Sequence, residues 1–574
     1  MTYVPQVWAD GAIGATPITA ARLAHIESGV LAAHAGYAAA VPRGGQVVDV
    51  LDHGAVGDGL VDDTAAIQAA LAAAVATGVR VVLLPRGTYK VTPVVQSRAI
   101  TAPSNVTLRG QHATIKVASG SPAYEAVISH VPAEALDNFQ VEGVIFDLNK
   151  AGNPQTAVVA NESRCAVKQY RGTGLRFRGN RVVNVDGTNT VVANGGGATG
   201  VPVVTDVEIT NNVFVDVGGV AAHDHSTIYT HGEGVVITGN RFYGTAGPSP
   251  SAVCAIEAHG NGHVVSGNHI NGYREAINVT GAANRTDSFT CTGNTIVRCL
   301  RGIRVFALAL YGGVQPALRG VAVTGNTAVL DPDYWTPVYD LEPYGIAHLA
   351  FDSSQQVHGL SITGNTLICK PYTGVSTNVV KLSASGVYYS PAGGTLAGGA
   401  DVGVTITGNT IHGFPGSGVR ATTCRTRGLL VSGNNISDCG HASLVTGDYK
   451  AGVGVDGELA SCLIAGNNIY DTRAAAAGLM LRGVTWLAST ASVDNVIRDN
   501  SVRLAGGSGG RNLFVGSNSG SPLVIARFAN DGSNVTLPAN SVAAGSRVLV
   551  ALTGVESYQT AAPAGTTWVT VAYP

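Results

Sequence analysis

The stretch ITGNRF (Ile237–Phe242) belongs to a pattern that recurs along most of the chain and decides its fold. The pattern is an apolar residue, a small or polar residue, Gly or another turn former, Asn, any residue and a second apolar residue. Its asparagine occurs at Asn180, Asn212, Asn240, Asn268, Asn294, Asn326, Asn365, Asn409, Asn434, Asn467 and Asn500. Successive asparagines are 25 to 44 residues apart. A repeat of this length is typical of solenoids and propellers.

The segments between these asparagines are rich in β-branched residues, alternate with period 2 and are punctuated by glycine. Each repeat is therefore predicted to hold two or three short strands. Stacked repeats of this kind form a right-handed parallel β-helix with a rise of about 4.8 Å per coil. We expect the recurring Asn at a tight turn, in the left-handed conformation that Asn tolerates, with the amide side chains bonded along the axis. A WD-type propeller is disfavoured because its Trp-Asp signature and regular period are missing.

Composition narrows the classes of function. The 574 residues include 75 glycines and only 13% charged residues, with a net charge of −2, so nothing favours a nucleic-acid or membrane-surface partner. We find no run of about 20 apolar residues and no secretory leader at the start of the chain, so we expect no membrane span and synthesis in a reducing cytosol. The eight cysteines lack C-x-x-C spacing, which indicates buried free thiols rather than disulfides or a metal cage.

A parallel stack needs a cap over its first coil. The segment VDDTAAIQAALAAAVATG (Val61–Gly78) predicts a capping helix. Asp62 or Asp63 can begin it, Gly78 can end it, and Ile67, Leu71 and Val75 are expected on one face. A buried strand follows at Val79–Pro85.

Three motifs in this order carry a family resemblance. DHGAVGDG (Asp52–Gly59), DDTAAIQAAL (Asp62–Leu71) and LPRGTY (Leu84–Tyr89) together resemble the start of the pectate-lyase-like β-helix superfamily. Phage tailspikes and polysaccharide depolymerases are prominent members of it. The resemblance implies the fold. It does not choose among lyases, hydrolases and binders without activity.

The first residues add a second resemblance. YVPQVWADGAIGATPITAARLAHIESGV (Tyr3–Val30) is similar to the N-terminal segment of tail adhesins from phages of Gram-positive hosts. This implies a homotrimer whose N-termini attach to phage tail or baseplate proteins, and hence a protein of the virion tail. From the residues alone, Thr16-Pro17 can start a helix with apolar residues at a/d spacing from Leu23 to Ala40. That helix could equally pack on its own β-helix.

These observations divide the chain into three parts. Residues 1–45 are predicted to form a helical attachment and trimerisation segment, and residues 46–505 a single-stranded, right-handed parallel β-helix capped by residues 46–90. Residues 506–574 contain four further strand-like segments and are predicted to form a small C-terminal β domain, either a trimer clasp or a second sugar-binding element. The predicted fold class is all-β.

Counting back from the asparagines predicts which side chains share a face. His231 and His259 each lie nine residues before their Asn, and Tyr229 and Glu257 each lie eleven before. Each pair should therefore stack about one coil apart. Because Ile256 and Ala258 should point inward, Glu257 and His259 are expected to face solvent.

Later coils extend this row of polar side chains, which suits an anionic or hydroxyl-rich glycan. The row continues with Asn278, Arg304, Tyr388, Arg420, Asp456 and Arg482. The insertion Asp331–Tyr344 carries Trp335 and three tyrosines, and aromatic side chains beside a groove can stack on sugars. The alternatives are a merely polar face for the row and loop packing for the aromatic residues.

Glycoside cleavage requires two carboxylates on either side of the bond. The predicted catalytic residue is Glu257, with Asp224 or Glu233 from the preceding coil as its partner; Glu275 and Asp147 are weaker candidates. The predicted substrate-binding residues are Tyr229, His231, His259, Asn278, Arg304, Trp335 and Tyr388. Six histidines lie between residues 223 and 269, but stacking spreads them over several coils, so we predict neither a metal site nor a cofactor.

The sequence therefore predicts a homotrimeric tailspike or tail adhesin that binds a host surface polysaccharide and cleaves it by endo-acting glycosidic hydrolysis. A receptor-binding tail protein without catalysis is the second hypothesis. A polysaccharide lyase stays open because Arg304 and His259 could serve β-elimination. A cellular cell-wall enzyme is disfavoured by the tail-like N-terminus.

Overall fold

The structure is a computed structural model. It describes residue 28 and residues 47–155, 164–187, 189–194, 204–218, 226–244, 254–280, 286–307, 318–335, 343–350, 356–371, 384–391, 395–396, 398–440, 450–473, 480–488, 492, 494–504, 511–515, 523–530, 547–550 and 567–570. The predicted N-terminal segment, Asp224 and Tyr339 lie outside these residues.

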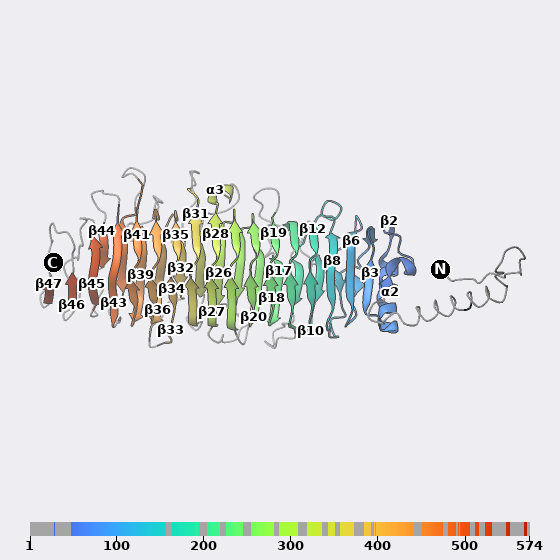
Figure 1. Ribbon diagram of the computed structural model, residues 1–574, viewed down its shortest axis with the longest axis horizontal. Coiled ribbons are helices and arrows are strands. Elements are labelled where there is room, and N and C mark those ends of the chain that lie inside the picture. The colour runs from blue at the N-terminus through green and yellow to red at the C-terminus, as the bar shows by residue number, and fades with distance from the viewer. Residues whose placement is uncertain are drawn as a thin grey trace, which may run out of the picture.

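The strands stack in parallel into one elongated coil, whose long axis is horizontal in Figure 1. Three columns of strands run along it, here called sheets A, B and C. The cap and first coils contain β1 (Val48–Asp49), η2 (Val50–His53), β2 (Asp58–Asp62), α2 (Thr64–Thr77), β3 (Val81–Leu84), β4 (Thr88–Val91), β5 (Arg98–Thr101), β6 (Thr107–Val117), β7 (Ala126–Ser129) and β8 (Gln140–Asp147). β6 and β8 each span sheets A and B, and β5 and β7 begin sheet C.

Sheet A continues through β11 (Arg176–Arg178), β15 (Glu208–Thr210), β18 (Val236–Thr238), β21 (Val264–Ser266), β24 (Thr286–Thr292), β27 (Leu318–Thr324), β30 (Val357–Thr363), β34 (Thr405–Thr407), β37 (Leu430–Ser432) and β40 (Leu463–Ala465). Sheet B continues through β12 (Arg181–Asp186), β16 (Val213–Gly218), β19 (Arg241–Tyr243), β22 (His269–Asn271), β25 (Thr295–Val297), β28 (Thr327–Leu330), β31 (Thr366–Cys369), β35 (Thr410–His412), β38 (Asn435–Ser437) and β41 (Asn468–Tyr470).

Sheet C continues through β9 (Cys165–Gln169), β13 (Asn189–Asn194), β17 (Ser226–Glu233), β20 (Cys254–Asn261), β23 (Glu275–Thr280), β26 (Arg301–Ala307), β29 (Ile346–Ala350), β32 (Val387–Ser390), β36 (Val419–Arg427), β39 (Ala451–Ala460), β42 (Arg482–Ala488) and β44 (Arg511–Val515). Short additions are β10 (Gly172–Thr173), β14 (Val204–Thr205), β33 (Asp401–Val402) and α3 (Pro332–Trp335). The last strands are β43 (Asn495–Arg503), β45 (Leu523–Asn530), β46 (Arg547–Val550) and β47 (Thr567–Thr570).

The recurring Asn lies at the corner between sheets A and B, but it is not the left-handed residue. That conformation belongs to the residue before it, usually glycine, as in Gly239 (φ 69°), and in two coils Asn211 (φ 57°) and Asp499 (φ 55°). The predicted backbone conformation of the repeated Asn was therefore wrong. The preceding Gly turns the chain, because glycine takes positive φ without steric penalty.

With the turn made by its neighbour, each Asn side chain points into the interior and stacks on the next. Asn240 Oδ1 accepts from the backbone N–H of Asn212 at 2.9 Å, and Asn240 Nδ2 donates to Ile209 O at 2.8 Å and to Asn268 Oδ1 at 3.0 Å. The backbone N–H contact to the next Asn repeats through all ten steps from Asn180 to Asn500. The predicted bonding of amides along the axis is confirmed.

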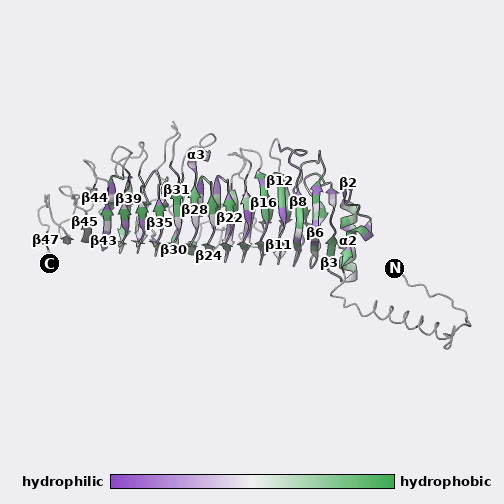
Figure 2. Ribbon diagram, turned by 45° about the horizontal axis from the view of Figure 1, so that its top comes forward, coloured by the Kyte–Doolittle hydropathy of each residue, from purple (hydrophilic) through white to green (hydrophobic). Residues whose placement is uncertain are grey.

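The core is the row of inward side chains from all three sheets. On sheet A the middle residue of each strand is buried, as at Ile209, Ile237 and Val265, and its neighbours are partly exposed. All eight cysteines are free and buried, as predicted. Figure 2 shows apolar residues throughout the stack and on α2. Among the described residues, no helix is long and apolar enough to cross a membrane.

Helix α2 covers the first coil at the N-terminal end of the stack (Figure 1). Its start is shared between two carboxylates: Asp62 accepts from the Thr64 backbone N–H at 2.9 Å, whereas Asp63 accepts from Val56 at 2.7 Å and so fixes the preceding loop. Gly78 ends the helix with φ 72°. Val75 is 39% exposed, so its predicted place on the buried face was wrong; small alanines accompany Ile67 and Leu71 there instead.

Parallel pairing continues beyond the last Asn of the repeat. β43 pairs with β45 from Asn495↔Leu523 to Val502↔Asn530, and β45, β46 and β47 follow in the same direction. A separate domain after residue 505 is therefore not confirmed: the described strands there extend the stack.

Candidate functional site on sheet C

The outward side chains of sheet C form one register across the stack. The Cα partners run Lys168, Val192, Tyr229, Glu257, Asn278, Arg304, Ala347, Tyr388, Arg420, Gly454 and Thr485. The predicted pairing of Tyr229 with Glu257 and of His231 with His259 is confirmed. Polar and charged residues thus share one line along the axis, with neighbouring coils about 4.8 Å apart.

Glu257 is the fourth residue of this register and is more enclosed than expected. It is 9% exposed and its neighbour His259 is 3% exposed, so the expectation that both face solvent was wrong. His259 Nε2 lies 2.9 Å from Glu257 Oε1, and the Ser226 hydroxyl donates to Oε2. Burial alone would raise the pKa of Glu257, but the hydrogen bonds from His259 and Ser226 and the charge of Arg304 together lower it. Glu257 is therefore a carboxylate at neutral pH.

His259, which bonds this carboxylate, contacts two further rings. The His259 ring lies 5.1 Å from the Tyr229 ring and 5.6 Å from the His231 ring, centroid to centroid. His259 Nδ1 is buried and has no hydrogen-bond partner among the described residues. A base, a hydroxyl and a carboxylate therefore meet within one coil of each other, which is the set of groups that acid–base chemistry on a sugar needs.

One coil further, Glu275 is held by arginines. Its carboxylate lies 2.7 Å from Arg301 Nη1 and 2.8 Å from Arg304 Nη2, and its side chain is 2% exposed. Burial would raise the pKa of Glu275, but Arg304, Arg301 and Arg274 hold it below its ordinary value. Glu275 thus anchors Arg304, whose Nε also approaches Asn278 Oδ1 at 3.3 Å. A carboxylate locked in this way positions cations and is poorly suited to act as an acid.

Of the two predicted catalytic partners of Glu257, the structure describes Glu233 but not Asp224. Glu233 lies four residues beyond Tyr229 on β17, roughly 13 Å along the strand from the Glu257 register, and accepts from Asn261 Nδ2 at 3.2 Å. The structure therefore does not bring Glu233 together with Glu257. Asp224 lies outside the described residues.

Towards the C-terminal end, the register contains Tyr388 and a fully buried Arg420. Arg420 forms an ion pair with Asp456, two residues beyond Gly454 on the same face. A Cβ at Gly454 would lie 2.9 Å from Arg420 Nη1, so glycine leaves the room that the guanidinium occupies. Arg482 was wrongly predicted for this row: Thr485 holds the register position, and Arg482 pairs with Ala451.

Trp335 does not offer a stacking surface. It lies on α3 at the edge of sheet B, is fully buried and donates from Nε1 to Arg298 O at 2.9 Å. The loop therefore packs against the coil through this ring. Tyr344, also buried, receives the Arg301 guanidinium 5.5 Å from its ring centroid.

A second polar cluster on sheet C was not predicted. Lys168 and Tyr170 both contact the Glu125 carboxylate, the Lys168 Nζ lies 4.7 Å from the Tyr170 ring centroid, and His130 Nε2 accepts from the Tyr170 backbone N–H at 2.8 Å. Lys168 is three coils before Glu257 in the same register. The only signal in the sequence was the alternation in CAVKQY, because no repeated Asn precedes Asn180 to count from.

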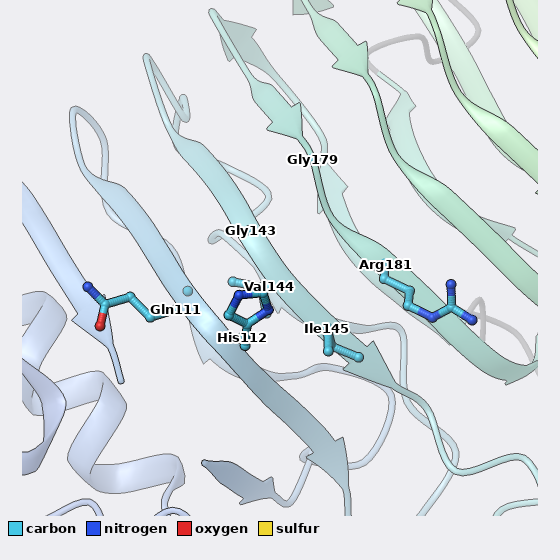
Figure 3. Close-up of a pocket in the computed structure, with 8 residues that line it drawn as sticks. Gln111, His112, Gly143, Val144, Ile145, Gly179 and Arg181 are labelled. Atoms are coloured by element: carbon cyan, nitrogen blue, oxygen red, sulfur yellow. The ribbon is translucent and has the colours of Figure 1, made fainter. Parts of the chain in front are cut away.

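Two hollows lie away from Glu257, near the N-terminal end of the stack. One of about 440 Å³ is lined by Gly110, Gly143 and Gly179 at the bend between sheets A and B near the N-terminal end. In Figure 3, Gln111 and Arg181 lie at opposite ends of it, with His112 and Ile145 between. An adjoining hollow of about 470 Å³ includes Arg109 and Glu142, which pair with each other. Both are glycine-lined surface depressions away from Glu257.

Comparison with known proteins agrees with this architecture. Residues 47–307 match the family model described as rhamnogalacturonase A/epimerase, pectate lyase-like, and residues 352–548 match that of the right-handed beta helix region. A segment of 108 residues is 36% identical to mannuronan C5-epimerase AlgE5 of Azotobacter vinelandii. It spans 18% of this chain and 11% of that enzyme, so the chain covers about a tenth of that relative's length.

Solved structures add a likeness of fold. A mutant tailspike protein of E. coli bacteriophage HK620, in complex with a pentasaccharide, is 15% identical with a TM-score of 0.50, over 91% of this chain and 78% of that chain. The A-module of mannuronan C-5 epimerase AlgE6 of A. vinelandii is 18% identical with a TM-score of 0.36, over 83% of this chain and 99% of that chain. The described fold is thus an all-β parallel solenoid, pectate-lyase-like over residues 47–307 and of the right-handed β-helix type over residues 352–548.

Proposed function

We propose that the chain is a phage tailspike that binds a host surface polysaccharide along the outer face of sheet C and depolymerises it by glycosidic hydrolysis. It acts as a homotrimer, attached to the virion tail through its N-terminal segment. The observation that carries the proposal is the polar register of sheet C, from Lys168 through Glu257 and Arg304 to Tyr388. Its groups suit a chain of sugars lying parallel to the axis.

In this proposal Glu257 is the catalytic carboxylate. Its lowered pKa suits the base or nucleophile of a glycosidase rather than the acid, which needs a proton at neutral pH. The acid must then come from another carboxyl group, and Asp224 remains our candidate. Tyr229, His231 and His259 bind the sugar beside Glu257, and Asn278, Arg304 and Tyr388 bind it in the following coils.

The test is release of new reducing ends from wall polysaccharides purified from a panel of Gram-positive bacteria. Wild type should release oligosaccharides from one of them, and Glu257→Gln should lower the rate by about 10²-fold or more while binding is retained. Glu208→Gln is the matched control, because Glu208 pairs with Arg178 on sheet A, away from the register. Full activity of Glu257→Gln would contradict the role of Glu257. Binding without release by wild type would leave a receptor-binding protein without catalysis.

A second candidate activity is β-elimination on a uronic-acid polysaccharide. It is favoured by His259 and Tyr229, which lie beside Glu257. Arg304 lies in the same register, two coils after Glu257. The arginine would neutralise the uronate, and His259 or Tyr229 would take the proton from the carbon beside its carboxyl group. The glycosidic carbon–oxygen bond would then break, and the leaving oxygen would take a proton from water. Elimination leaves a carbon–carbon double bond in the product, so a rise in ultraviolet absorbance during cleavage would identify a lyase. A product without that absorbance would identify a hydrolase.

A further inference from the structure

Helix α2, which caps the stack, is apolar on both of its faces. Its residues, Thr64–Thr77, include no Asp, Glu, Lys or Arg. The inner face packs on η2, β1, β3, β4 and β5. The outer face, here called the cap face, consists of Ala65, Ala69, Ala72, Val75 and Ala76, which are all exposed. A helix that is apolar all round is normally enclosed on every side, so the cap face is expected to have a cover.

Exposed apolar side chains also gather around α2. Among the described residues, eight of the nine large apolar side chains that are exposed lie in the cap and the first coils, and only Val402 lies elsewhere. The eight are Val47, Leu51, Val56, Leu60, Val61, Val75, Val94 and Val95. A single exposed apolar residue is ordinary on a protein surface, but a group confined to one end of the molecule marks a contact surface.

The N-terminal segment of the same chain is tethered next to this surface. The described chain begins again at Val47, directly before β1, and β1 contacts α2. Six residues separate Val47 from Ala40, where the helix predicted for this segment ends. Six residues span at most about 20 Å. Because α2 is itself about 21 Å long, the predicted helix cannot leave the neighbourhood of the cap face.

The predicted helix from Thr16 to Ala40 has an apolar stripe that matches the cap face. The stripe contains Leu23, Ile26, Val30, Ala33 and Tyr37 at a/d spacing. The two charged residues of the helix, Arg22 and Glu27, lie beside the stripe. Ser28, which the structure describes, is helical and exposed, as its position opposite the stripe requires. An amphipathic helix of this length owes most of its stability to the surface on which its apolar face packs.

We propose that the helix of residues 16–40 lies on α2 of its own chain, with its apolar stripe against the cap face. The alanines of the cap face let two helices approach to about 8 Å, the short end of the usual range. The six-residue tether gives a millimolar effective concentration, so a modest contact is enough to hold the helix in place. Residues before Thr16 stay available to a tail protein. The inference explains how this head is held on the β-helical shaft, and it requires neither sugar binding nor catalysis.

Cysteine labelling of the full-length chain tests whether the cap face is covered. All eight native cysteines are buried, so a cysteine introduced at the surface is the group that a maleimide reaches in the folded protein. Ala69→Cys, on the cap face, should react at least tenfold more slowly than Ser119→Cys, an exposed position after β6. Equally fast labelling of the two cysteines would contradict the proposal.

Charges on the N-terminal helix test what the cover is. Leu23→Asp with Val30→Asp places two carboxylates on the apolar stripe, and burial of unpaired charges is unfavourable. This double variant should raise the labelling rate of Ala69→Cys at least tenfold and should speed tryptic cleavage at Arg22 by a similar factor.

Ser28→Asp with Ala35→Asp is the matched control, because it adds the same two charges opposite the stripe. Labelling of Ala69→Cys should then remain slow. Circular dichroism and the melting temperature verify that the shaft is folded in every variant. If Ala69→Cys stays protected when Leu23 and Val30 are both replaced, something other than this helix covers the cap face and the proposal is wrong.

Cross-linking identifies the copy that supplies the helix. Glu27→Cys lies beside the stripe and Thr77→Cys lies at the exposed end of α2, so both should stay reactive in one chain. A bismaleimide that spans α2 should join them within that chain, which then runs as a single polypeptide of 58.3 kDa on a denaturing gel. A band of twice that mass would mean that the helix of another copy covers α2, and the proposal would be wrong.

Discussion

The Gly–Asn pair at each corner divides two tasks between neighbouring residues. The Gly takes positive φ and turns the chain, which frees the Asn to use its amide in the interior. In the coil of Asn294, that amide accepts the backbone N–H of Asn268 at 3.0 Å and donates to Val265 O at 3.0 Å. A buried polar side chain is tolerated here because its donors and acceptor are satisfied by the coils on either side.

Removal of one amide should therefore destabilise the stack. Asn294→Ala leaves the buried N–H groups of Asn268 without their acceptor, which costs about 2–4 kcal/mol for the set of bonds lost. The control is Asn468→Ala, an exposed Asn beside the ladder whose side chain donates to Asn435 Oδ1 at 2.9 Å. Thermal melting of both variants checks this. Equal melting temperatures would show that the ladder adds little to stability.

A buried histidine should make stability depend on pH. His263 is fully buried, donates to His259 O at 2.6 Å, and burial lowers its pKa to about 4. In the unfolded chain its pKa is near 6.5, so below that pH the unfolded state binds a proton that the folded state refuses. The contribution of His263 is complete above pH 6.5 and is lost as the pH falls towards 4, by about 3 kcal/mol at that end.

His263→Gln keeps a donor at this position and cannot titrate in this range. It should flatten the fall in melting temperature between pH 6.5 and 4 that wild type shows. His358→Gln, on the partly exposed edge of sheet A, serves as the control. If wild type and His263→Gln have the same pH slope, the folded histidine accepts a proton more readily than its burial implies.

At the scale of elements, a column of glycines lies at the start of five successive strands of sheet C. It contains Gly302, Gly345, Gly386, Gly418 and Gly452. A Cβ at Gly386 would lie 2.2 Å from Ile411 Cγ2 and 2.6 Å from Gly418 O, so the start of this sheet C strand packs directly on the side chain of a sheet B strand. The absence of a side chain here lets the coil close tightly.

Gly386→Ala should force the Ile411 side chain and the next coil apart. Overpacking of this kind costs about 1–3 kcal/mol. Gly398→Ala is a suitable control, because a Cβ there meets Thr395 at an ordinary 3.5 Å. Chemical denaturation compares the two. Comparable stability of Gly386→Ala and wild type would mean that the coil can widen freely.

The register of sheet C could be predicted from the sequence where residues could be counted back from a repeated Asn. The pairs Tyr229–Glu257 and His231–His259 were found because the connection from sheet C to the next Asn has the same length in both coils. Arg482 was misplaced because that length changes; Gly483, which continues the glycine column, marks the true register. The alternation of apolar and polar residues could not reveal the burial of Glu257. It predicts which face of the strand a side chain lies on, but not the contacts with Ser226 and His259 that enclose Glu257.

At the scale of the whole molecule, the stack depends on its cap. Helix α2 covers the first coil with Ile67 and Leu71, both fully buried. Without it, the first strands would present unpaired backbone groups and apolar side chains to solvent, and such an open end associates with other chains.

Leu71→Asp should therefore displace the cap and make the protein aggregate. Ala72→Asp adds the same charge one residue further, on the exposed side of α2, and should leave the protein soluble. Light scattering during purification and heating distinguishes them. A soluble, well-folded Leu71→Asp protein would show that the first coil needs no helix above it.

The corner between sheets A and B has one further consequence, for how such a chain can change in evolution. From Asn180 to Asn500 the coils share the same corner, with Gly before the Asn in nine of the eleven, while the spacing between asparagines varies from 25 to 44 residues. Duplication or loss of one whole period, such as the 28 residues from Asn240 to Asn268, would join two compatible corners. The length of the shaft and the segments beside sheet C can therefore be altered by recombination without redesign of the interior.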